Sequence, residues 1–461
     1  MMMGHGVSGS FRDPAGHVFC REGIYYRQVN HAGREDYERL QSSGLYETLT
    51  AAGLLIPHDN LGLVDTAEPE AWTVLRPRQV PFISYPHEWA FSQLRDAALA
   101  TLEIQRRAMA AGMSLKDANA ANIQFVDGRP LLIDTLSLER LTAGPWVGYR
   151  QFCQHFLAPL ALASFSDQRL SRVSQLFVDG VPLDFASRLL PLSTWLRRGP
   201  LLHLHLHAVG ERRLAHRPSP APAPATSRAT GADLKEAVIA SLRRAVQRLR
   251  WQPDGAWKDY YERRESYTAD ADSQKQSLVA EWLDRARPAT LWDLGANTGR
   301  FSRLATDLGV RTVAFDQDAS CVERMYVDAR QRKDPYLLPL VMDLTNPSPA
   351  MGWAHEERAS LIQRGPAEWV LALAILHHLA IGNNVPLDRI ARFMRSVGRE
   401  LVIEFVPKDD PMVRAMLASR ADVFPEYDVR GFESIFSRHF LIERRVELRD
   451  GARVLYWMRA R

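Results

Sequence analysis

The sequence has 461 residues, of which 46% are hydrophobic and 24% are charged, with a formal net charge of +4. This balance excludes a disordered or fibrous chain, and the length favours two domains. So small a net charge gives no clear indication of a nucleic-acid partner. No apolar run reaches the length of about 18 residues that a membrane-spanning helix needs, so we expect no membrane span.

The cysteines are sparse and widely separated. Cys20, Cys153 and Cys321 lack the spacing of a metal site, and an odd set of this kind is typical of free thiols in a reducing compartment. The first residues contain no apolar segment of the signal-peptide type. We therefore expect a cytoplasmic protein, and the sequence gives no indication of its oligomeric state.

A proline-rich segment divides the sequence. Residues 216–232 contain four prolines that alternate with small residues, which predicts a semi-extended tether. The predicted organisation is a first domain over 1–215, a linker over 216–232, and a second domain over 233–461. The second domain is expected to begin with a helical lead-in that includes an amphipathic basic helix over 233–249. A cut near Ala225 is expected to leave two folded pieces.

The first domain is predicted to be of the α+β class, with a small β-rich start and a large helical end. Apolar spacing and turn residues predict its elements in chain order. They are a hairpin over 16–29 that turns at Arg21-Glu22-Gly23, a helix over 35–52, a strand pair over 72–85, a long helix over 87–111 ended by Gly112, and a mostly helical segment over 147–210.

The second domain alternates strands and helices. Strands are expected near 290–294, 311–315, 337–341, 368–374 and 400–406, followed by a hairpin over 440–460 with its turn at Asp450-Gly451. Five β/α units closed by an antiparallel hairpin predict an α/β fold, with a doubly wound, Rossmann-like sheet of seven strands.

The string LWDLGANTGRFS combines an acidic strand end with a glycine-rich turn into a helix. Gly295 and Gly299 allow a positive φ and a close approach of the backbone to a ligand. Asn297 occupies the middle position, where asparagine is the best substitute for glycine in a left-handed conformation. The start of the helix offers free N–H groups to a carboxylate, and Asp293 is placed to hold an ammonium group.

Further candidate ligand residues follow the next strands. Asp316 ends the second strand, where its carboxylate can accept both hydroxyls of a ribose. Asp343 ends the third strand and is placed near an adenine amino group, and Leu373 ends the fourth at the same edge. A nicotinamide dinucleotide site is excluded, because the glycine spacing is wrong and an acidic residue precedes the loop.

These motifs resemble the class I S-adenosyl-L-methionine-dependent methyltransferases. The segments DLGANTG, AILHHL and VIEFVPKDDPM are similar in particular to a bacterial group related to nodulation host-specificity proteins. The resemblance implies a cofactor, S-adenosyl-L-methionine, that Asp293, Asp316 and Asp343 hold. The Asn/Asp-Pro-Pro-aromatic motif of enzymes that methylate DNA adenine or glutamine is absent after the fourth strand, which argues against those acceptors.

Three residues at the same sheet edge are candidates for catalysis. His377 and His378 follow the fourth strand where a general base would lie, with His378 preferred, and Glu404 ends the fifth strand and could orient the acceptor. The alternatives are a histidine that packs against the cofactor and a solvated acid at a strand end. Four aromatic residues before the sheet could form a lid or pack onto it: Trp257, Tyr260, Tyr261 and Tyr267.

The segment MSLKDANAANIQFVDGRPLLIDTLSLER resembles the catalytic segment of protein kinases and aminoglycoside phosphotransferases. The resemblance implies a site for ATP and Mg²⁺, with Asp117 as the base and Asn122 and Asp134 as magnesium ligands. The departures are Lys116 before the aspartate, Thr-Leu after Asp134, no glycine-rich loop, and only Arg27 to replace the strand lysine. The alternative is a β-hairpin whose polar residues fill turns.

The alternation of His203, His205 and His207 would place all three on one face of a strand but spread them around a helix, and no metal site is predicted. We consider three functions. The first is a methyltransferase whose kinase-like domain orients a small-molecule or glycan acceptor. The second is a bifunctional kinase-methyltransferase that modifies a saccharide or another small molecule. The third is a non-catalytic regulator that binds S-adenosylmethionine.

Overall fold

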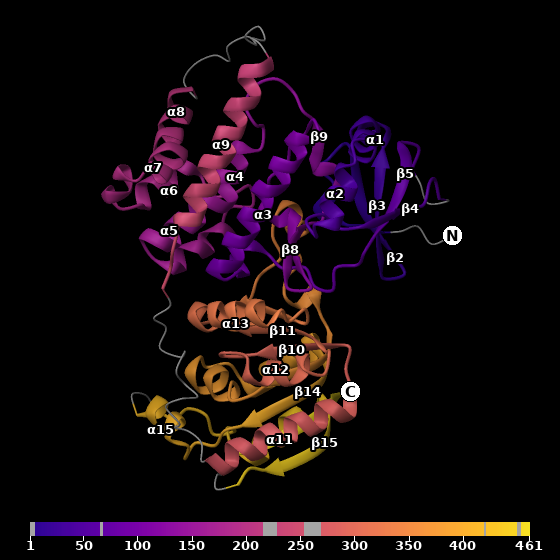
Figure 1. Cartoon of the computed structure of the whole chain (residues 1–461). Helices are drawn as coiled ribbons and strands as arrows, with labels where there is room; N and C mark the ends of the chain where they lie inside the picture. Colours follow the sequence, from indigo (N-terminus) through magenta and orange to yellow (C-terminus); the bar gives the residue numbers. More distant parts are fainter. Residues whose placement is uncertain (1–4, 65–67, 215–227, 253–268, 419–420, 450–452) are drawn as a thin grey trace. The chain divides into compact units, whose positions relative to one another are not determined.

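The computed structural model describes residues 5–64, 68–214, 228–252, 269–418, 421–449 and 453–461 (Figure 1). The chain forms two compact units. Unit 1 consists of Met1–Gln252 together with Met351–Arg358, and unit 2 of Pro253–Ala350 together with Ala359–Arg461. Within the described ranges, no helix combines the length and apolar character needed to cross a membrane.

Unit 1 begins with a five-stranded antiparallel sheet in the order β1-β2-β3-β5-β4. Its strands are β1 (His5–Gly6), β2 (Gly16–Arg21), β3 (Ile24–Asn30), β4 (His58–Asn60) and β5 (Ala71–Pro77). The predicted hairpin over 16–29 is confirmed, since β2 pairs with β3 and both Glu22 and Gly23 have a positive φ in the turn.

Two predictions for this region need correction. The helix expected over 35–52 is interrupted at Gly44, whose φ is +70°, and forms α1 (Arg34–Ser42) and α2 (Leu45–Ala51). The strand pair expected over 72–85 is the single strand β5, whose hairpin partner is β4. Pro77 and Pro81 lack the N–H group that a second strand would need, which explains why the ladder ends there.

The long helix predicted over 87–111 is α3 (Phe91–Ala110), and it begins after a short turn that contains Pro86. Two small ladders follow. In the first, β6 (Met113–Leu115) pairs with β9 (Leu138–Arg140), and in the second β7 (Ile123–Val126) pairs with β8 (Arg129–Leu132). The loops that flank these strands carry the Asp117–Asp134 motif.

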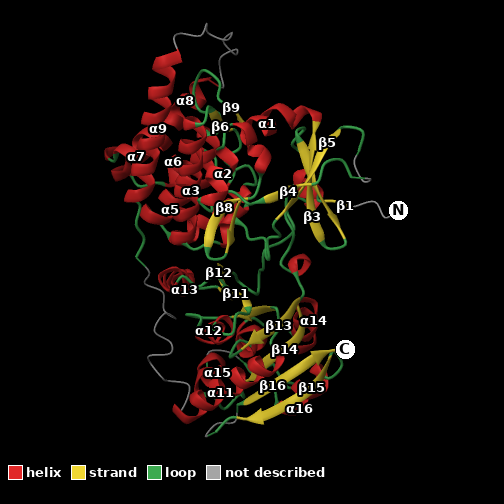
Figure 2. Ribbon diagram, turned by 45° about the vertical axis from the view of Figure 1, so that its right-hand side comes forward, coloured by secondary structure: helices red, strands yellow, loops and turns green. Residues whose placement is uncertain are grey.

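The rest of unit 1 is helical, as predicted, and Figure 2 shows these helices as a group separate from the five-stranded sheet. They are α4 (Tyr149–Phe152), α5 (Ala158–Phe165), α6 (Leu183–Leu189), α7 (Arg198–Pro200), α8 (Leu206–Leu214) and α9 (Arg228–Arg248). The core of unit 1 lies between these helices, α3 and the small ladders, and includes fully buried Phe152, Phe156 and Leu242.

The domain boundary differs from the one predicted. Residues 216–227 of the expected linker lie outside the described residues, but α9 begins at Arg228, beyond the last proline of the segment. The sequence grouped residues 233–249 with the second domain, whereas α9 packs in unit 1. Its apolar face buries Ile239, Leu242 and Val246, and Arg243 forms an ion pair with Glu103 of α3.

Unit 1 also contains a short segment from the second half of the sequence, Met351–Arg358. Met351 and Arg358 exchange both backbone hydrogen bonds and so close the segment into a loop. Glu357 accepts from the guanidinium of Arg12 at 2.6 Å, and buried Arg358 donates to the backbone oxygen of Val178 at 2.9 Å. These contacts complete the packing of unit 1 with a segment that begins just over 100 residues beyond α9 in the sequence.

Unit 2 contains the predicted seven-stranded doubly wound sheet, in the order β12-β11-β10-β13-β14-β16-β15, with only β16 antiparallel to its neighbours (Figure 2). The strands are β10 (Thr290–Leu294), β11 (Arg311–Asp316), β12 (Leu337–Val341), β13 (Ala367–Ala372), β14 (Gly398–Phe405), β15 (Phe440–Glu447) and β16 (Val454–Ala460). The helices are α11 (Ala269–Ala286), α12 (Arg300–Thr306), α13 (Ala319–Arg332), α14 (Leu387–Val397), α15 (Pro411–Leu417) and α16 (Val429–Phe436).

The five predicted parallel strands are confirmed within two residues at each end. Their central residues are fully buried, because helices cover both faces of a sheet of this kind. The terminal hairpin is also confirmed, but its turn at Asp450-Gly451 lies outside the described residues. The order of the sheet brings the carboxyl ends of β12, β11, β10 and β13 side by side, where ligands bind in folds of this class.

Candidate functional site

The loop after β10 has the backbone conformation that its sequence predicts. Gly295, Asn297 and Gly299 have φ values of 80°, 51° and 77°, so Asn297 does adopt the left-handed conformation. A Cβ at Gly295 would lie 2.9 Å from Cδ1 of Ile375, and a Cβ at Gly299 would lie 2.8 Å from the sulfur of Met325. The loop therefore needs glycine both for its conformation and for its close packing.

Two carboxylates lie at this edge of the sheet on adjacent strands. Asp293 is 2% exposed and accepts from the hydroxyl of Ser302 at 2.6 Å. Asp316 accepts from the backbone N–H groups of Asn297 at 2.7 Å and Asp318 at 2.8 Å. Burial raises the pKa of each carboxyl to about 6, and neither forms an ion pair within the described parts of the chain.

The other two predicted ligand residues also lie at this edge. Asp343 follows β12 and accepts from the backbone N–H and the hydroxyl of Thr345, at 2.9 and 2.6 Å, so its carboxylate caps a turn. Leu373 follows β13 and is 8% exposed. The next residue, Ala374, has a φ of +52°, a costly conformation that often marks a functional site.

The two histidines lie at the start of a π-helical turn, His378–Gly382, with their rings 4.3 Å apart. His377 is 2% exposed, burial lowers its pKa to about 3, and its Nδ1 has no hydrogen-bond partner within the described residues. His378 is partly exposed, and burial lowers its pKa too. Both rings therefore favour the neutral form at neutral pH, and His378 is the more exposed of the two.

Glu404 lies in an ion-pair network instead of facing solvent. Its carboxylate is fully buried and contacts Nζ of Lys275 at 2.6 Å and the guanidinium of Arg453 at 3.2 Å. Arg453 also pairs with Asp410 at 2.7 Å. The sequence did not reveal Lys275 or Arg453, because they approach Glu404 from α11 and from the start of β16. With two cations on its carboxylate, Glu404 can position the strand end but has little capacity left for an acceptor.

The aromatic candidates Trp257, Tyr260, Tyr261 and Tyr267 lie outside the described residues.

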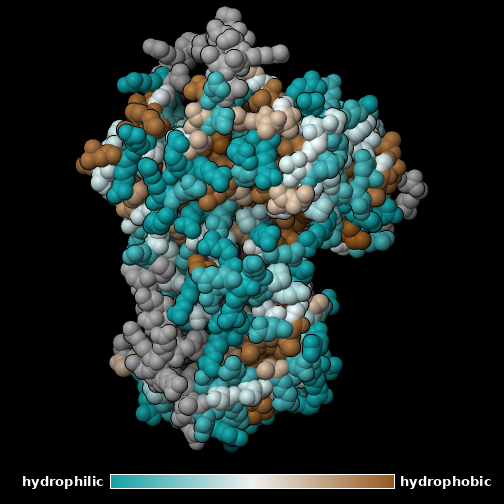
Figure 3. All heavy atoms as spheres, in the orientation of Figure 1, coloured by the Kyte–Doolittle hydropathy of each residue, from teal (hydrophilic) through white to brown (hydrophobic). Residues whose placement is uncertain are grey.

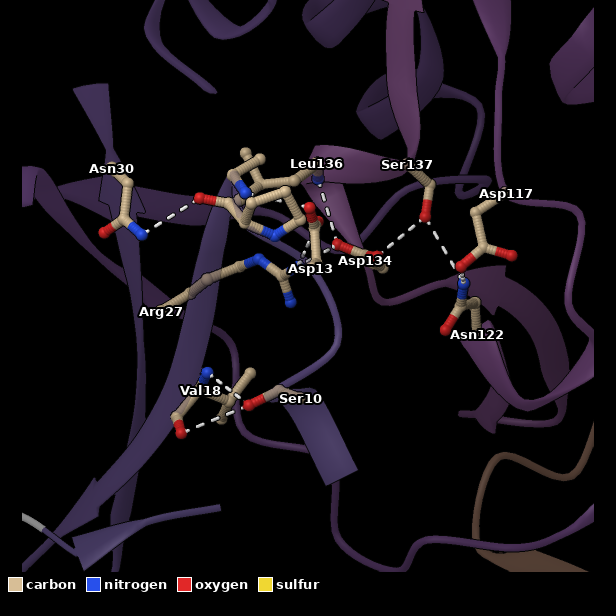
Figure 4. Close-up of polar contacts among 12 residues, drawn as sticks. Ser10, Asp13, Val18, Arg27, Asn30, Asp117, Asn122, Asp134, Leu136 and Ser137 are labelled. Atoms are coloured by element: carbon tan, nitrogen blue, oxygen red, sulfur yellow. Dashed lines mark hydrogen bonds and ion pairs between the residues drawn. The ribbon is translucent and has the colours of Figure 1, made fainter. Parts of the chain in front are cut away.

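In unit 1, the motif residues lie together in one chain of contacts (Figure 4). Asn122 donates to Asp117 at 2.9 Å and to the hydroxyl of Ser137 at 3.3 Å, and Ser137 donates to Asp134 at 2.7 Å. The guanidinium of Arg27 on β3 lies 2.5 Å from Asp134. Burial, and next the charge of Asp134, raise the pKa of Asp117.

A glycine-rich segment does precede this site, and the expectation that there is none was wrong. Residues 4–9 have the sequence Gly-His-Gly-Val-Ser-Gly, with the Gly-x-Gly-x-x-Gly spacing, although Gly4 lies outside the described residues. The segment leads into a loop in which Ser10 exchanges hydrogen bonds with Val18 on β2, and the next residues bring Asp13 to 3.9 Å from Arg27. A scan for glycine spacing at the start of the sequence would have found it.

The three alternating histidines are helical, so they do not share one face. His203 contacts Tyr149 and Ser241 at 2.8 and 2.9 Å, whereas His205 contacts Ser187 and Thr194. His207 lies 3.4 Å from Glu211 on the next turn. Both ring nitrogens of His203 and of His205, and Nε2 of His207, therefore contact a neighbouring side chain.

The predicted free cysteines are present as thiols, with Cys153 and Cys321 buried.

No family model matches the sequence. The chain is 33% identical over 462 residues to the nodulation protein NoeA of Rhizobium meliloti (strain 1021), an alignment that covers 98% of this chain and 95% of NoeA. The chain belongs to the NoeA family. Membership of the NoeA family confirms the resemblance to nodulation host-specificity proteins that the sequence predicted.

Several solved structures resemble parts of this NoeA-family chain at low identity. The bifunctional kinase-methyltransferase WbdD is 16% identical over 41% of this chain and 38% of WbdD, with a TM-score of 0.30. The magnesium protoporphyrin IX methyltransferase ChlM of Synechocystis PCC 6803, solved with bound SAH, is 18% identical over 41% of this chain and 84% of ChlM, with a TM-score of 0.30. The chain thus spans about two fifths of the length of WbdD.

Proposed function

We propose that unit 2 binds S-adenosyl-L-methionine at the carboxyl edge of its sheet and transfers the methyl group to an acceptor. The observation that carries this proposal is the pair of carboxylates on adjacent strands, buried Asp293 and half-buried Asp316, next to the left-handed Gly295–Gly299 loop. Two ionised carboxylates without an ion-pair partner are costly where burial limits their hydration, and a ligand with an ammonium group and two hydroxyls would compensate them. The donor set therefore fits this cofactor.

Each residue of the edge has a defined role in this proposal. Asp293 holds the ammonium group, Asp316 accepts both ribose hydroxyls, and Asp343 accepts from the adenine amino group, with Leu373 beside them at the same edge. Bound S-adenosylmethionine supplies an electrophilic methyl group. His378 is neutral and partly exposed, so it can accept a proton from a hydroxyl or amine of the acceptor. Glu404, Lys275 and Arg453 fix the end of β14 and the start of β16 beside it.

The acceptor belongs to the class of small molecules or glycans in this proposal, and unit 1 orients it. Its discovery requires a labelling experiment. Cell extract is incubated with the full chain and methyl-labelled cofactor, and the label is then fractionated by size and by chemistry. We expect the label in a small-molecule or saccharide fraction, and none with the Asp316→Ala variant. Full cofactor binding without transfer of the label to any fraction would favour the third hypothesis, a regulator without catalysis.

We further propose that unit 1 is a kinase-like module. Support comes from the order of its elements: a five-stranded sheet with α1 and α2 between β3 and β4, then α3, then the two small ladders that flank the motif. The approach of Asp117, Asn122 and Asp134 also favours this fold over a simple hairpin with polar turns. Lys116, Thr135 and Arg27 still differ from the residues that protein kinases have at these positions. In kinases these positions belong to the part of the site that binds phosphate and metal.

A second function, phosphoryl transfer by unit 1, is favoured by one observation. Arg27 lies against Asp134, and its Nε has no hydrogen-bond partner within the described residues, so it retains a donor for a phosphate oxygen. The opposing consideration is that Arg27 already neutralises Asp134, which weakens the attraction of this carboxylate for Mg²⁺. We therefore expect the module to orient the acceptor without transferring phosphate.

Thermal unfolding of the full chain with magnesium-ATP separates the two functions. A ligand at 100 times its dissociation constant stabilises a protein by about 2.7 kcal/mol, which is a measurable shift. We expect no magnesium-dependent shift. A clear shift that disappears in Asp134→Asn but persists in Asp59→Asn, a change at an exposed acid of the same unit, would establish the bifunctional alternative.

A further inference from the structure

An apolar surface of unit 1 is exposed where the short 3-10 helix Leu192–Leu196 leads into α7. Leu192 is 85% exposed and Leu196 is 90% exposed, and Trp195 between them is 38% exposed. Figure 3 shows apolar side chains that protrude at the left edge, near the position of α7 in Figure 1. We call Leu192, Trp195 and Leu196, with the neighbouring Arg188, Arg197 and Arg198, the Leu-Arg patch.

In the Leu192–Leu196 segment the polar side chain of Thr194 is buried and the leucines are exposed, which is the reverse of the usual arrangement. Thr194 and His205 are fully buried, and Ser187 is 9% exposed. Thr194 contacts Nε2 of His205 at 2.8 Å, and Ser187 contacts Nδ1 at 2.7 Å, so both ring nitrogens are used. A sequence that only had to bury apolar surface would place the leucines inside and the threonine outside.

The buried polar network also fixes the orientation of the exposed side chains. The ring of Trp195 stacks on His205 at 4.3 Å with an angle of 11° between the planes. Thr194 also donates to the backbone oxygen of Pro191 at 2.5 Å, which tightens the turn that carries Leu192. The exposed leucines therefore lie on a structured segment and not on a loose loop, which is the arrangement of a built contact surface.

The charge around the patch is positive. Residues 185–210 contain three arginines and no acidic residue. Arg188 pairs with Asp184 at 3.6 Å, whereas Arg197 and Arg198 are both exposed, so these two supply the charge of the patch. The backbone of α7 lies against α9, since a Cβ at Gly199 would lie 2.8 Å from Cβ of Ala245. Two more exposed arginines, Arg244 and Arg248, follow this part of α9.

We propose that the Leu-Arg patch docks unit 1 on an anionic lipid bilayer, with Leu192 and Leu196 in the outer hydrocarbon and the arginines at the headgroups. Protruding leucines beside a tryptophan and surrounded by arginines match the layers of a bilayer surface, namely apolar chains, an interface that favours tryptophan, and anionic headgroups. Because the apolar part is short, the binding is weak and reversible.

The test is co-sedimentation of the full chain with vesicles. We expect binding to vesicles of equal parts phosphatidylglycerol and phosphatidylcholine, and little binding to phosphatidylcholine alone. The double variant Leu192→Ser/Leu196→Ser should bind on the order of tenfold less. The double variant Arg197→Glu/Arg198→Glu should lose binding to a similar extent, and raised salt should weaken the wild type.

A matched control is Leu63→Ser, which removes a leucine that is 67% exposed near β4 of the same unit and should bind vesicles as the wild type does. The leucines of the patch have few contacts to lose, so the variants should unfold at the wild-type temperature. Equal binding to both kinds of vesicle, or unchanged binding of the double serine variant, would overturn the proposal. So would a dimer of the wild type, seen by sedimentation velocity, that the double serine variant dissociates, because a second copy would then cover the patch.

Discussion

Both units place aspartates at the ends of strands, but they compensate them differently. In unit 2, Asp293 and Asp316 are held by hydroxyl and backbone N–H groups, and burial raises the pKa of each to about 6. In unit 1, Asp134 has the guanidinium of Arg27 at 2.5 Å and the hydroxyl of Ser137 at 2.7 Å. The first arrangement leaves negative charge for a ligand to compensate, whereas the second satisfies it internally.

This difference favours a cofactor site in unit 2 over one in unit 1. A carboxylate without a cation favours a ligand that carries an ammonium group or hydroxyls, and binding such a ligand recovers part of the cost of burial. A carboxylate that already has a cation gains less from a metal ion. The same reasoning predicts how each unit should respond to changes in these groups.

The largest expected effect is at Gly295. Gly295→Val should abolish cofactor binding, because its Cβ would lie 2.9 Å from Ile375 at a φ of +80°, where a branched side chain is strained. The control is Gly309→Val, which has a φ of +78° but no atom closer than 3.8 Å to its Cβ. It introduces the strain alone, away from the loop. Calorimetry with S-adenosylmethionine should show binding only for the control, and retained affinity in Gly295→Val would remove the loop from the site.

The next effect concerns where unit 1 ends. A fragment of residues 1–225 lacks α9 and exposes the surface that Leu242, Val246 and Leu249 bury. Each buried side chain of this kind contributes about 1.5–3 kcal/mol, so the loss exceeds the stability of many domains. A fragment of residues 1–252 keeps α9, lacks only Met351–Arg358 of unit 1, and should still unfold cooperatively in a thermal melt. If the shorter fragment melts with equal cooperativity and at the same temperature, the assignment of α9 to unit 1 is wrong.

A smaller effect is expected from the cation of unit 1. Arg27→Gln leaves the partly buried carboxylate of Asp134 without its partner, which should lower the free energy of unfolding by about 3 kcal/mol. Arg76→Gln breaks an exposed pair with Asp59 on the same sheet and should change stability little. Urea unfolding of the full chain measures both. Equal effects of the two variants would show that Arg27 does not compensate Asp134 in solution.

The pH dependence of cofactor binding should follow the two carboxyls of unit 2. Their folded pKa of about 6 lies above the usual value near 4, so their contribution to stability is favourable below pH about 4 and is lost as pH rises through about 6. Cofactor binding has the opposite sign, because it uses the ionised form. Affinity should fall about tenfold from pH 7.5 to pH 5 for each group that the cofactor engages. Calorimetry that gives the same affinity at both pH values would contradict these roles.

Much of unit 2 could be predicted from the sequence because its information is local. Buried parallel strands form continuous apolar runs, and Gly295, Asn297 and Gly299 mark the turn after the first of them. The network around Glu404 could not be predicted, because Lys275 and Arg453 lie 129 and 49 residues away along the chain. Pairings over such distances depend on how the helices and the hairpin pack around the sheet.

The same reason explains the errors in unit 1. The amphipathic pattern of a helix such as α9 indicates that one face packs against another element, but it does not identify that element. The packing of α9 against α3 and α7 in the structure places it in unit 1. Met351–Arg358 is a similar case, since the ion pair of Arg12 with Glu357 joins residues 345 positions apart. The prediction near Trp72–Tyr85 failed for a local reason, because it gave too little weight to Pro77 and Pro81.

The central claim is that Asp316 holds the ribose of S-adenosylmethionine in unit 2, and isothermal titration of the full chain with this cofactor tests it most directly. We expect the wild type to bind with a stoichiometry of one and Asp316→Ala to bind on the order of 10- to 100-fold more weakly, since two charge-assisted hydrogen bonds are lost. Asp307→Ala, which removes an exposed carboxylate at the end of α12, should bind as the wild type does. Equal affinity of the Asp316→Ala variant and the wild type, or no binding by the wild type, would contradict the account.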